Sequence, residues 1–128
     1  MTDKRLLLLV IDRKEATMGL FTSDGLVILR NLQGNVPRYH SKDGQSALRF
    51  ERMIDIATEG FHSNVHAHLL NCLVATGLTI HDVVIGGPGP TKDSFASKYL
   101  PLTVQRYDVG YTDRHGLHEL LGAMENDP

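Results

Sequence analysis

The sequence predicts an α/β domain in which helices pack on the faces of a single mixed β-sheet of about five strands. A near-continuous apolar run lies near the amino terminus, a long amphipathic stretch follows the first third, and short apolar strands then alternate with helical segments. The 128 residues are 41% hydrophobic and 22% charged, as in ordinary globular proteins. A chain of this length can bury a core, so residues 1–128 are expected to form one domain.

The first third of the chain is expected to form an antiparallel meander. Arg5–Ile11 is an apolar run that ends at Asp12, which is typical of a central strand buried on both faces. Ala16–Phe21 and Leu26–Leu29 flank Asp24-Gly25, and an Asp-Gly pair between two β-prone runs is a strong hairpin signal. Three consecutive strands are therefore predicted.

A polar loop and a long helix are predicted next. Gln33–Gly44 shows no apolar period. Beyond it, apolar residues recur at three- and four-residue steps: Leu48, Phe50, Met53, Ile54, Ala57, Phe61, Val65, Leu69, Cys72 and Leu73. We expect this helix to end at Gly77 and to be bent or weakened at Gly60, because glycine costs about 1 kcal/mol relative to alanine there.

The last part of the chain is expected to alternate strands and helices. Asp82–Gly86 predicts a strand, and Thr91 is well placed to cap a short helix that reaches Tyr99. Thr103–Val109 alternates as a last strand, and Leu117–Met124 predicts a closing helix.

Charge and hydropathy exclude some classes of protein. The longest apolar run is far shorter than the roughly 20 residues that span a bilayer, and no signal-like segment opens the chain, so a cytoplasmic protein without membrane contact is expected. Cys72 is the only cysteine and is expected to be buried. The net charge of −2 gives no bulk attraction to nucleic acid, so any contact with RNA must be local.

Residues 35–52 are the segment best suited to such a contact. Basic side chains outnumber acidic ones there, with Arg38, Lys42, Arg49 and Arg52 against Asp43 and Glu51. His40 adds positive charge when protonated. A basic loop that leads into a helix amino terminus suits phosphates, because the first-turn N–H groups and the helix dipole favour anions. On composition alone, a solvated loop with ordinary helical charge spacing is the favoured interpretation.

Four separated motifs resemble the middle domain of the archaeal and eukaryotic class-I translation release factors. The first is similar to the tip of that domain, where a Gly-Gly-Gln triplet opens a long helix: Pro37, His40, Gly44-Gln45-Ser46-Ala47, Arg49-Phe50 and Arg52. The others follow in order: Ile11–Ala16, then Gly86–Lys92 with Phe95, then Tyr111-Thr112 with Gly116-Leu117 and Glu119-Leu120. The resemblance covers nearly the whole chain and implies the ribonuclease-H-like architecture of release-factor middle domains.

This resemblance implies a role in translation termination. In the family, the tip enters the ribosomal peptidyl-transferase centre, where water cleaves the ester between the peptide and the terminal adenosine of tRNA. Gln45 would position the water and Gly44 would supply the backbone geometry, because a glutamine offers a donor and an acceptor but no useful pKa. The implied RNA-contacting residues are Arg38, His40, Lys42, Ser46, Arg49 and Arg52. Hydrolysis is expected only on the ribosome, with no cofactor and no metal.

The implied partners are the ribosomal RNA of that centre and the acceptor end of peptidyl-tRNA. Full-length family members also carry a stop-codon-reading domain and a domain that engages the class-II release-factor GTPase, and neither fits into 128 residues. The chain is expected to be either an excised piece or a solitary domain with little codon selectivity. High mobility is expected from about Tyr39 to Gln45.

Asp43 departs from the family, because it stands where the family has its first glycine. Aspartate tolerates positive φ better than most residues, so the turn is still accessible, but its negative charge would meet adenosine and ribosomal phosphates. Hydrolysis is therefore expected to be strongly reduced. The alternative is an inactive paralogue, or a non-catalytic module that binds ribosomes or RNA and is indifferent to Gln45.

Other patterns suggest chemistry less specifically. Glu59, His62 and His66 would share a helical face, with His68 nearby, but no cysteine pair or His-Glu-x-x-His motif supports a metal site, and exposed histidines are common on helices. Gly86–Lys92 lacks the residue order of a phosphate loop and is interpreted as a strand-to-helix turn. Leu48 stands where a nucleophile elbow around Ser46 would need glycine.

Asp12 ends the first predicted strand. With Glu15 or Asp82 it could hold Mg²⁺ for nuclease chemistry. A strand-end aspartate that starts a turn is the simpler interpretation.

Overall fold

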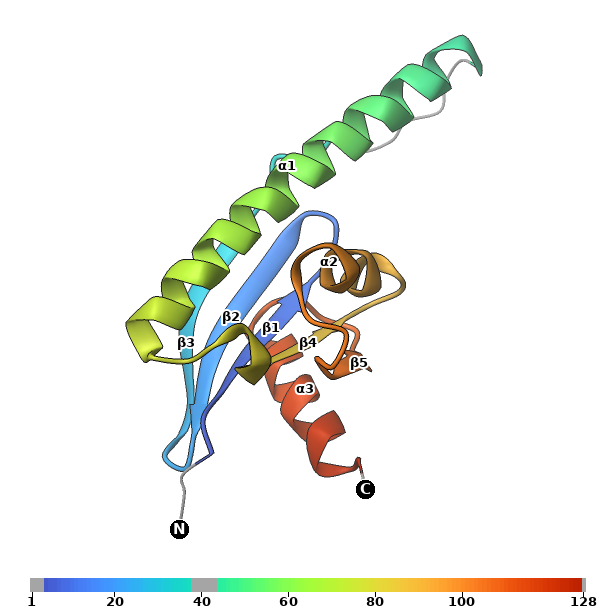
Figure 1. Ribbon diagram of the computed structural model, residues 1–128. Helices are drawn as coiled ribbons and strands as arrows, with labels where there is room; N and C mark the ends of the chain where they lie inside the picture. Colours follow the sequence, from blue (N-terminus) through green and yellow to red (C-terminus); the bar gives the residue numbers. More distant parts are fainter. Residues whose placement is uncertain (1–3, 38–43, 128) are drawn as a thin grey trace.

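The computed structural model describes residues 4–37 and 44–127. Figure 1 shows a mixed five-stranded sheet with strand order β3-β2-β1-β4-β5, which confirms the predicted fold class. In chain order the elements are β1 (Leu6–Ile11), β2 (Glu15–Thr22), β3 (Gly25–Gln33), α1 (Gly44–Thr76), the short 3₁₀ helix η1 (Ile80–Asp82), β4 (Val83–Gly87), α2 (Thr91–Tyr99), β5 (Arg106–Asp108) and α3 (Arg114–Glu125).

The amino-terminal meander is confirmed. β1 pairs antiparallel with β2, and β2 pairs antiparallel with β3 across a turn at Ser23-Asp24 that is followed by Gly25 with φ 120°. A side chain at this φ is strained, so glycine suits the position. On its other side β1 pairs parallel with β4, which makes it the central strand.

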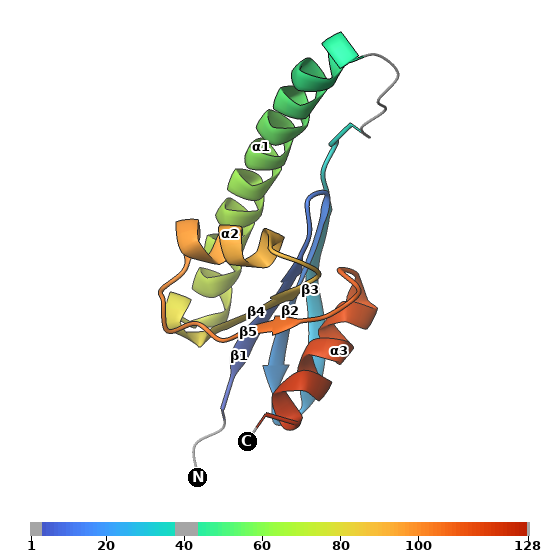
Figure 2. The same ribbon diagram turned by 90° about the vertical axis from the view of Figure 1, so that its right-hand side faces the viewer.

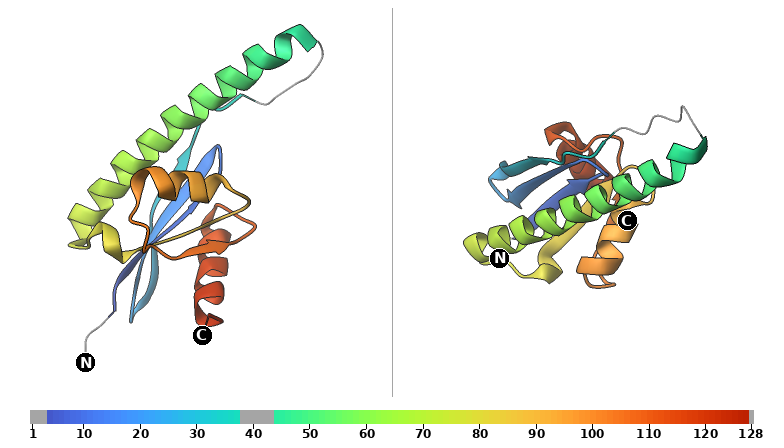
Figure 3. Two further views of the ribbon diagram at one scale, coloured as in Figure 1. Left: turned by 45° about the vertical axis from the view of Figure 1, so that its right-hand side comes forward. Right: turned by 90° about the horizontal axis from the view of Figure 1, so that it is seen from above.

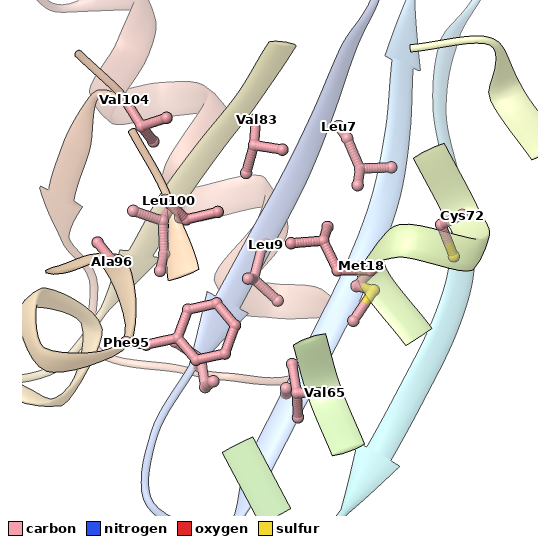
Figure 4. Packing of buried hydrophobic residues seen from close by; sticks show 14 of the residues in the cluster. Leu7, Leu9, Met18, Val65, Cys72, Val83, Phe95, Ala96, Leu100 and Val104 are labelled. Atoms are coloured by element: carbon pink, nitrogen blue, oxygen red, sulfur yellow. The ribbon is translucent and has the colours of Figure 1, made fainter. Parts of the chain in front are cut away.

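The sheet separates two apolar layers, as Figure 2 shows with α1 and α2 on one face and α3 on the other. Alternate residues of β1 enter opposite layers: Leu7 and Leu9 pack toward α1 and α2, whereas Leu8 and Val10 pack toward α3. This is the reason β1 is apolar at every position. Figure 4 shows the larger layer, in which residues from β1, β2, α1 and α2 meet, including Leu9, Met18, Val65 and Phe95.

Helix α1 ends at the predicted glycine. Gly77 has φ 73°, its N–H donates to the Val74 carbonyl at 3.3 Å, and the Leu78 N–H donates to the Leu73 carbonyl at 3.1 Å. These two bonds form a Schellman cap, which satisfies carbonyls that the helix leaves without partners. Cys72 lies buried on the inner face of α1, and burial raises the pKa of its thiol.

Gly60 lies within α1, and the helix continues through it without interruption. It is exposed, and a Cβ added there would have no atom within 4 Å. We therefore expect Gly60→Ala to raise the free energy of unfolding by about 1 kcal/mol, because alanine restricts the unfolded chain and favours the helix. Urea denaturation followed by circular dichroism would measure this. A loss of stability would contradict the open environment seen here.

The carboxyl-terminal elements differ in detail from the prediction. β4 begins one residue later than predicted, because Ile80–Asp82 forms the 3₁₀ turn. Thr91 is the first residue of α2 and not its cap; Pro90 occupies the N-cap position, without a side-chain hydrogen bond to the helix.

The predicted strand over Thr103–Val109 is also too long. Only Arg106–Asp108 pairs with β4, since the Val104 N–H donates to the Pro101 carbonyl at 3.1 Å and holds the chain in a turn. α3 begins earlier than predicted, at Arg114, because the Asp113 carboxylate accepts the His115 N–H at 2.9 Å and caps the helix.

Across residues 4–37 and 44–127, no helix combines the length and the hydropathy that a membrane span requires.

Candidate functional site

The amino-terminal end of α1 extends beyond the sheet, as Figures 1 and 3 show. Ile54 is the first fully buried residue of α1 for which burial is described, and residues 47–53 are exposed or half-buried. We call residues 44–53 the finger. At a rise of 1.5 Å per residue these residues place the start of α1 about 15 Å from Ile54. The finger is therefore supported mainly by its own helical hydrogen bonds.

The root of the finger contains a buried residue, Ile54, and one weak ion pair. Ile54 lines a cleft together with Val36 and Pro37, which follow β3, and with Pro88 at the end of β4. Arg13, in the β1–β2 turn, lies 3.8 Å from the Asp55 carboxylate, and both side chains are more than half exposed. An exposed pair of this kind adds little stability, so the burial of Ile54 is the stronger anchor at the root of the finger.

Five of the predicted site residues lie on the finger. Gly44 is the first residue of α1, and Gln45 and Ser46 follow in the first turn. Arg49 and Arg52 lie on the next two turns and are exposed. Positions 45, 49 and 52 have the i, i+4, i+7 spacing of one helical face.

The other predicted site residues lie outside the described residues: Arg38, His40, Lys42 and Asp43. Of the stretch from Tyr39 to Gln45 for which mobility is expected, only Gly44 and Gln45 are described, and both belong to α1. The undescribed residues lie between Pro37 and the start of α1. The basic loop is therefore adjacent to the finger in the sequence.

The sequence suggested that the histidines of α1 are exposed, but they do not share one helical face directed at solvent. His62 is buried, and its Nε2 lies 2.9 Å from the Asp12 carbonyl, so Nε2 carries the hydrogen and donates it. His66 stacks on Tyr99 with ring centroids 4.4 Å apart, and burial lowers the pKa of its imidazole. No group of three or more His, Cys, Asp or Glu side chains within 4–37 and 44–127 is arranged to hold a metal ion.

Asp12 starts a turn, which confirms the simpler interpretation of this residue. Its Oδ1 accepts the N–H groups of Lys14 at 2.8 Å and Glu15 at 2.7 Å. Asp82 lies at the opposite end of the sheet, at the start of β4, and its carboxylate accepts the Thr79 N–H at 2.8 Å. The two aspartates therefore do not share a site.

Thr112 is a structural residue that the sequence did not reveal. Its hydroxyl lies 3.0 Å from both the Asp12 and the Glu15 carboxylates, and its carbonyl accepts the Thr17 hydroxyl at 2.7 Å. It thus joins the segment before α3 to the β1–β2 turn. No local pattern signals a contact across so much of the chain.

The glycine-rich turn after β4 does not present its lysine to a ligand. Lys92 is buried, and its ammonium binds the Asp108 carboxylate and the Gly89 carbonyl. The prediction of a strand-to-helix turn is confirmed, although Thr91 is not its cap.

These features define a class of protein: an α/β domain whose longest helix projects from the sheet and begins with Gly-Gln. A family model described as eRF1 domain 2 matches residues 5–127. The chain therefore belongs to the eRF1 domain 2 family, as its motifs indicated.

The particular relatives are archaeal release factors. The chain is 42% identical over 120 residues to peptide chain release factor subunit 1 of Thermoplasma acidophilum, covering 89% of this chain and 29% of that protein. The corresponding Archaeoglobus fulgidus protein is 38% identical over 128 residues, covering 94% of this chain and 31% of that protein. The chain thus spans less than a third of the length of these relatives.

Solved structures agree on the fold. The crystal structure of the archaeal translation termination factor aRF1 matches with a TM-score of 0.72 and 26% identity, covering 97% of this chain and 35% of that one. The Thermoplasma acidophilum Pelota protein matches with a TM-score of 0.59 and 16% identity, covering 94% of this chain and 32% of that one. The Pelota match shows a shared fold only.

Proposed function

We propose that this chain acts in translation termination, as the domain that promotes hydrolysis of the peptidyl-tRNA ester in the peptidyl-transferase centre. The observation that carries the proposal is the finger: a helix end that begins with Gly44-Gln45 and has no buried residue from Ala47 to Met53. Sequence identity of 42% to an archaeal release factor supports this assignment.

The proposed chemistry is positioning of the nucleophile. The Gln45 side chain, with a donor and an acceptor, orients water toward the ester carbonyl, and its backbone N–H stabilises the oxyanion that develops. Gly44 lets the RNA approach the backbone closely. No residue here has to act as a general base, since the surrounding RNA forms the rest of the site.

RNA contact is proposed for residues on both sides of the glycine. Arg49 and Arg52 are exposed on the finger, where guanidinium groups suit phosphate oxygens. The loop residues Arg38, His40 and Lys42, together with Ser46, complete the proposed set.

The wider assignments are also proposals. Residues 1–128 are proposed as a single release-factor middle domain. Its proposed partners are ribosomal RNA of the peptidyl-transferase centre and the acceptor end of peptidyl-tRNA, in the cytoplasm. Engagement of a class-II release-factor GTPase is proposed only for domains beyond this one.

The direct test is peptide release from ribosomes loaded with peptidyl-tRNA. We expect Gln45→Ala to lower the release rate about tenfold, because it removes one positioning group from a site already weakened by Asp43. Gln105→Ala is the matched control, since Gln105 is an exposed glutamine before β5, far from the finger. Equal rates for Gln45→Ala and the unchanged chain, with release above background, would exclude the proposed role of Gln45.

Asp43 favours a second candidate function, a module that binds ribosomes without catalysing hydrolysis. In that case release stays at background for every variant. Binding to ribosomes would then depend on Arg49 and Arg52, but not on Gln45. The release assay separates the two functions, because only the hydrolytic function predicts release above background that depends on Gln45; pelleting of the chain with ribosomes, with Arg49→Ala and Gln45→Ala compared, then measures binding alone.

A further inference from the structure

Helix α1 has a second apolar face, opposite the one that packs on the sheet. Its inner face is buried through Ile54, Phe61, Val65, Leu69 and Cys72. On the opposite side of the helix, seven exposed residues recur at alternating three- and four-residue steps. We call them the outer seam: Met53, Ile56, Gly60, Ser63, Ala67, Leu70 and Val74. The seam itself contains no charged residue.

The large residues of the outer seam are uncovered. Met53 is 49% exposed, Ile56 63%, Leu70 44% and Val74 84%. Figures 1 and 3 show α1 along one side of the molecule, with the sheet and α2 on its inner side. A solvent-facing helix normally carries polar residues on its outer face, so a helix that is apolar on two opposite faces favours a partner on each.

The centre of the outer seam is built from small residues. Gly60, Ser63 and Ala67 occupy three successive positions. Gly60 relieves no clash within the chain, because a Cβ there would meet nothing within 4 Å, although glycine weakens a helix by about 1 kcal/mol. Packed helices approach to about 8–10 Å between axes, and the smallest residues permit the shortest distances. The centre therefore suits the close approach of another helix.

A second copy of α1 fits this seam, because Ser63 is its middle residue and the seam is symmetrical about Ser63 to within one residue. In an antiparallel pair centred there, Ile56 of one copy lies opposite Leu70 of the other. By the same symmetry Gly60 lies opposite Ala67, so large residues meet at both ends and small residues meet in the middle. A twofold dimer needs this kind of self-complementary surface.

Charge favours the antiparallel arrangement. Residues 64–76 contain no Asp, Glu, Lys or Arg, so the charged half of each α1 would lie against the uncharged half of its partner. A parallel pair would instead place Arg49, Arg52 and Glu59 against their own copies, which is unfavourable.

We propose that two copies of this chain associate through the outer seam as an antiparallel α1 pair with its twofold axis at Ser63. From Met53 to Val74 the seam is about 32 Å long, which gives a footprint of about 300 Å² per copy for a helix about 10 Å wide. A standard interface buries roughly 800 Å² per partner, so the association is weak and depends on concentration. It does not involve Gln45, but Met53 belongs to both the seam and the finger, so the tests below measure association itself and not peptide release.

Disulfide trapping tests the axis. In the full chain, Ser63→Cys is expected to form a covalent dimer on mild oxidation at high protein concentration, because the two copies of position 63 meet at the axis. Ala67→Cys is the matched control: it is equally exposed on the seam, but its two copies lie about 12 Å apart along the helices, beyond the reach of a disulfide. We expect it to link at least about tenfold more slowly. The native Cys72 is buried and serves as the background in both variants.

Sedimentation equilibrium of the unmodified chain tests association without a cross-link. The dimer fraction is expected to rise with concentration and to be lost in Ala67→Glu, which places a charge in the seam. Ser97→Glu is its control, because Ser97 is exposed on α2, away from the seam. Equal trapping of Ser63→Cys and Ala67→Cys, a monomer at every concentration, or a dimer that survives Ala67→Glu would each overturn the proposal.

Discussion

We expect Asp43→Gly to raise the rate of peptidyl-tRNA hydrolysis on ribosomes about a hundredfold. In the sequence, Asp43 immediately precedes Gly44 and lies two residues before Gln45, the residue proposed to position water. A negative charge about 5 Å from a developing oxyanion is unfavourable by about 3 kcal/mol at an effective dielectric constant near 20. A barrier change of this size corresponds to about two orders of magnitude in rate.

Asp43→Asn separates charge from shape. Asparagine keeps the size of the side chain and its ability to accept a hydrogen bond from a helix N–H, but it carries no charge. If the charge of Asp43 is what slows hydrolysis, Asp43→Asn gives most of the rate increase seen with Asp43→Gly. If the Cβ atom is what slows hydrolysis, only Asp43→Gly gives that increase. The measurement is single-turnover release of labelled peptide at saturating ribosome concentration, so that binding does not limit the rate.

Stability does not confound this comparison. Replacing an aspartate that precedes a helix with glycine changes stability by only a few tenths of a kcal/mol. Thermal unfolding of the two variants is therefore expected to coincide with that of the unchanged chain. Indistinguishable release rates for the unchanged chain, Asp43→Gly and Asp43→Asn, all above background, would show that Asp43 does not suppress hydrolysis.

Much of the fold could be predicted from the sequence because the strongest patterns are local. The apolar run of β1, the Asp-Gly hairpin and the long period of α1 each reflect one repeated choice of side chain. The end of α1 at Gly77 was predictable for the same reason, since a Schellman cap depends on a single glycine.

The incorrect predictions concern residues whose environment is set by tertiary contacts. His62 is polar, so its position in the sequence suggested a solvated helix face, yet the Asp12 carbonyl satisfies its N–H and its ring packs in a T-shaped arrangement with Phe95. Only three residues of the predicted last strand belong to β5, because Val104 is used for packing and not for pairing.

The candidate site was predictable as a motif but not as a geometry. Gly44-Gln45 marks the finger in the sequence, whereas the cleft at its root is lined by Ile54, Val36 and Pro88, which are distant from one another in the sequence. The hydrogen bonds of Thr112 to Asp12 and Glu15 likewise connect distant segments. Such contacts follow from the folded topology, so residue spacing alone does not reveal them.

The second large effect is expected at Gly116, near the start of α3. We expect Gly116→Ala to lower the free energy of unfolding by about 3 kcal/mol, because a rigid core site tolerates added volume poorly. An added Cβ would overlap the backbone carbonyl of Tyr111 and would also lie 3.3 Å from Val10 Cγ2. The carbonyl cannot move freely, because Tyr111 adjoins Thr112, which is bonded to the β1–β2 turn.

Gly122→Ala is the matched control, since Gly122 lies two turns further along the same helix and a Cβ there would meet nothing within 4 Å. This change is expected to raise stability by up to about 1 kcal/mol, because alanine is the better helix former. The two variants therefore replace the same residue type in the same helix but are expected to change the free energy of unfolding in opposite directions. Urea unfolding monitored by circular dichroism measures both. If Gly116→Ala were as stable as Gly122→Ala, α3 would have to sit further from the Tyr111 backbone than it does, and the close packing of this helix on β1 would be wrong.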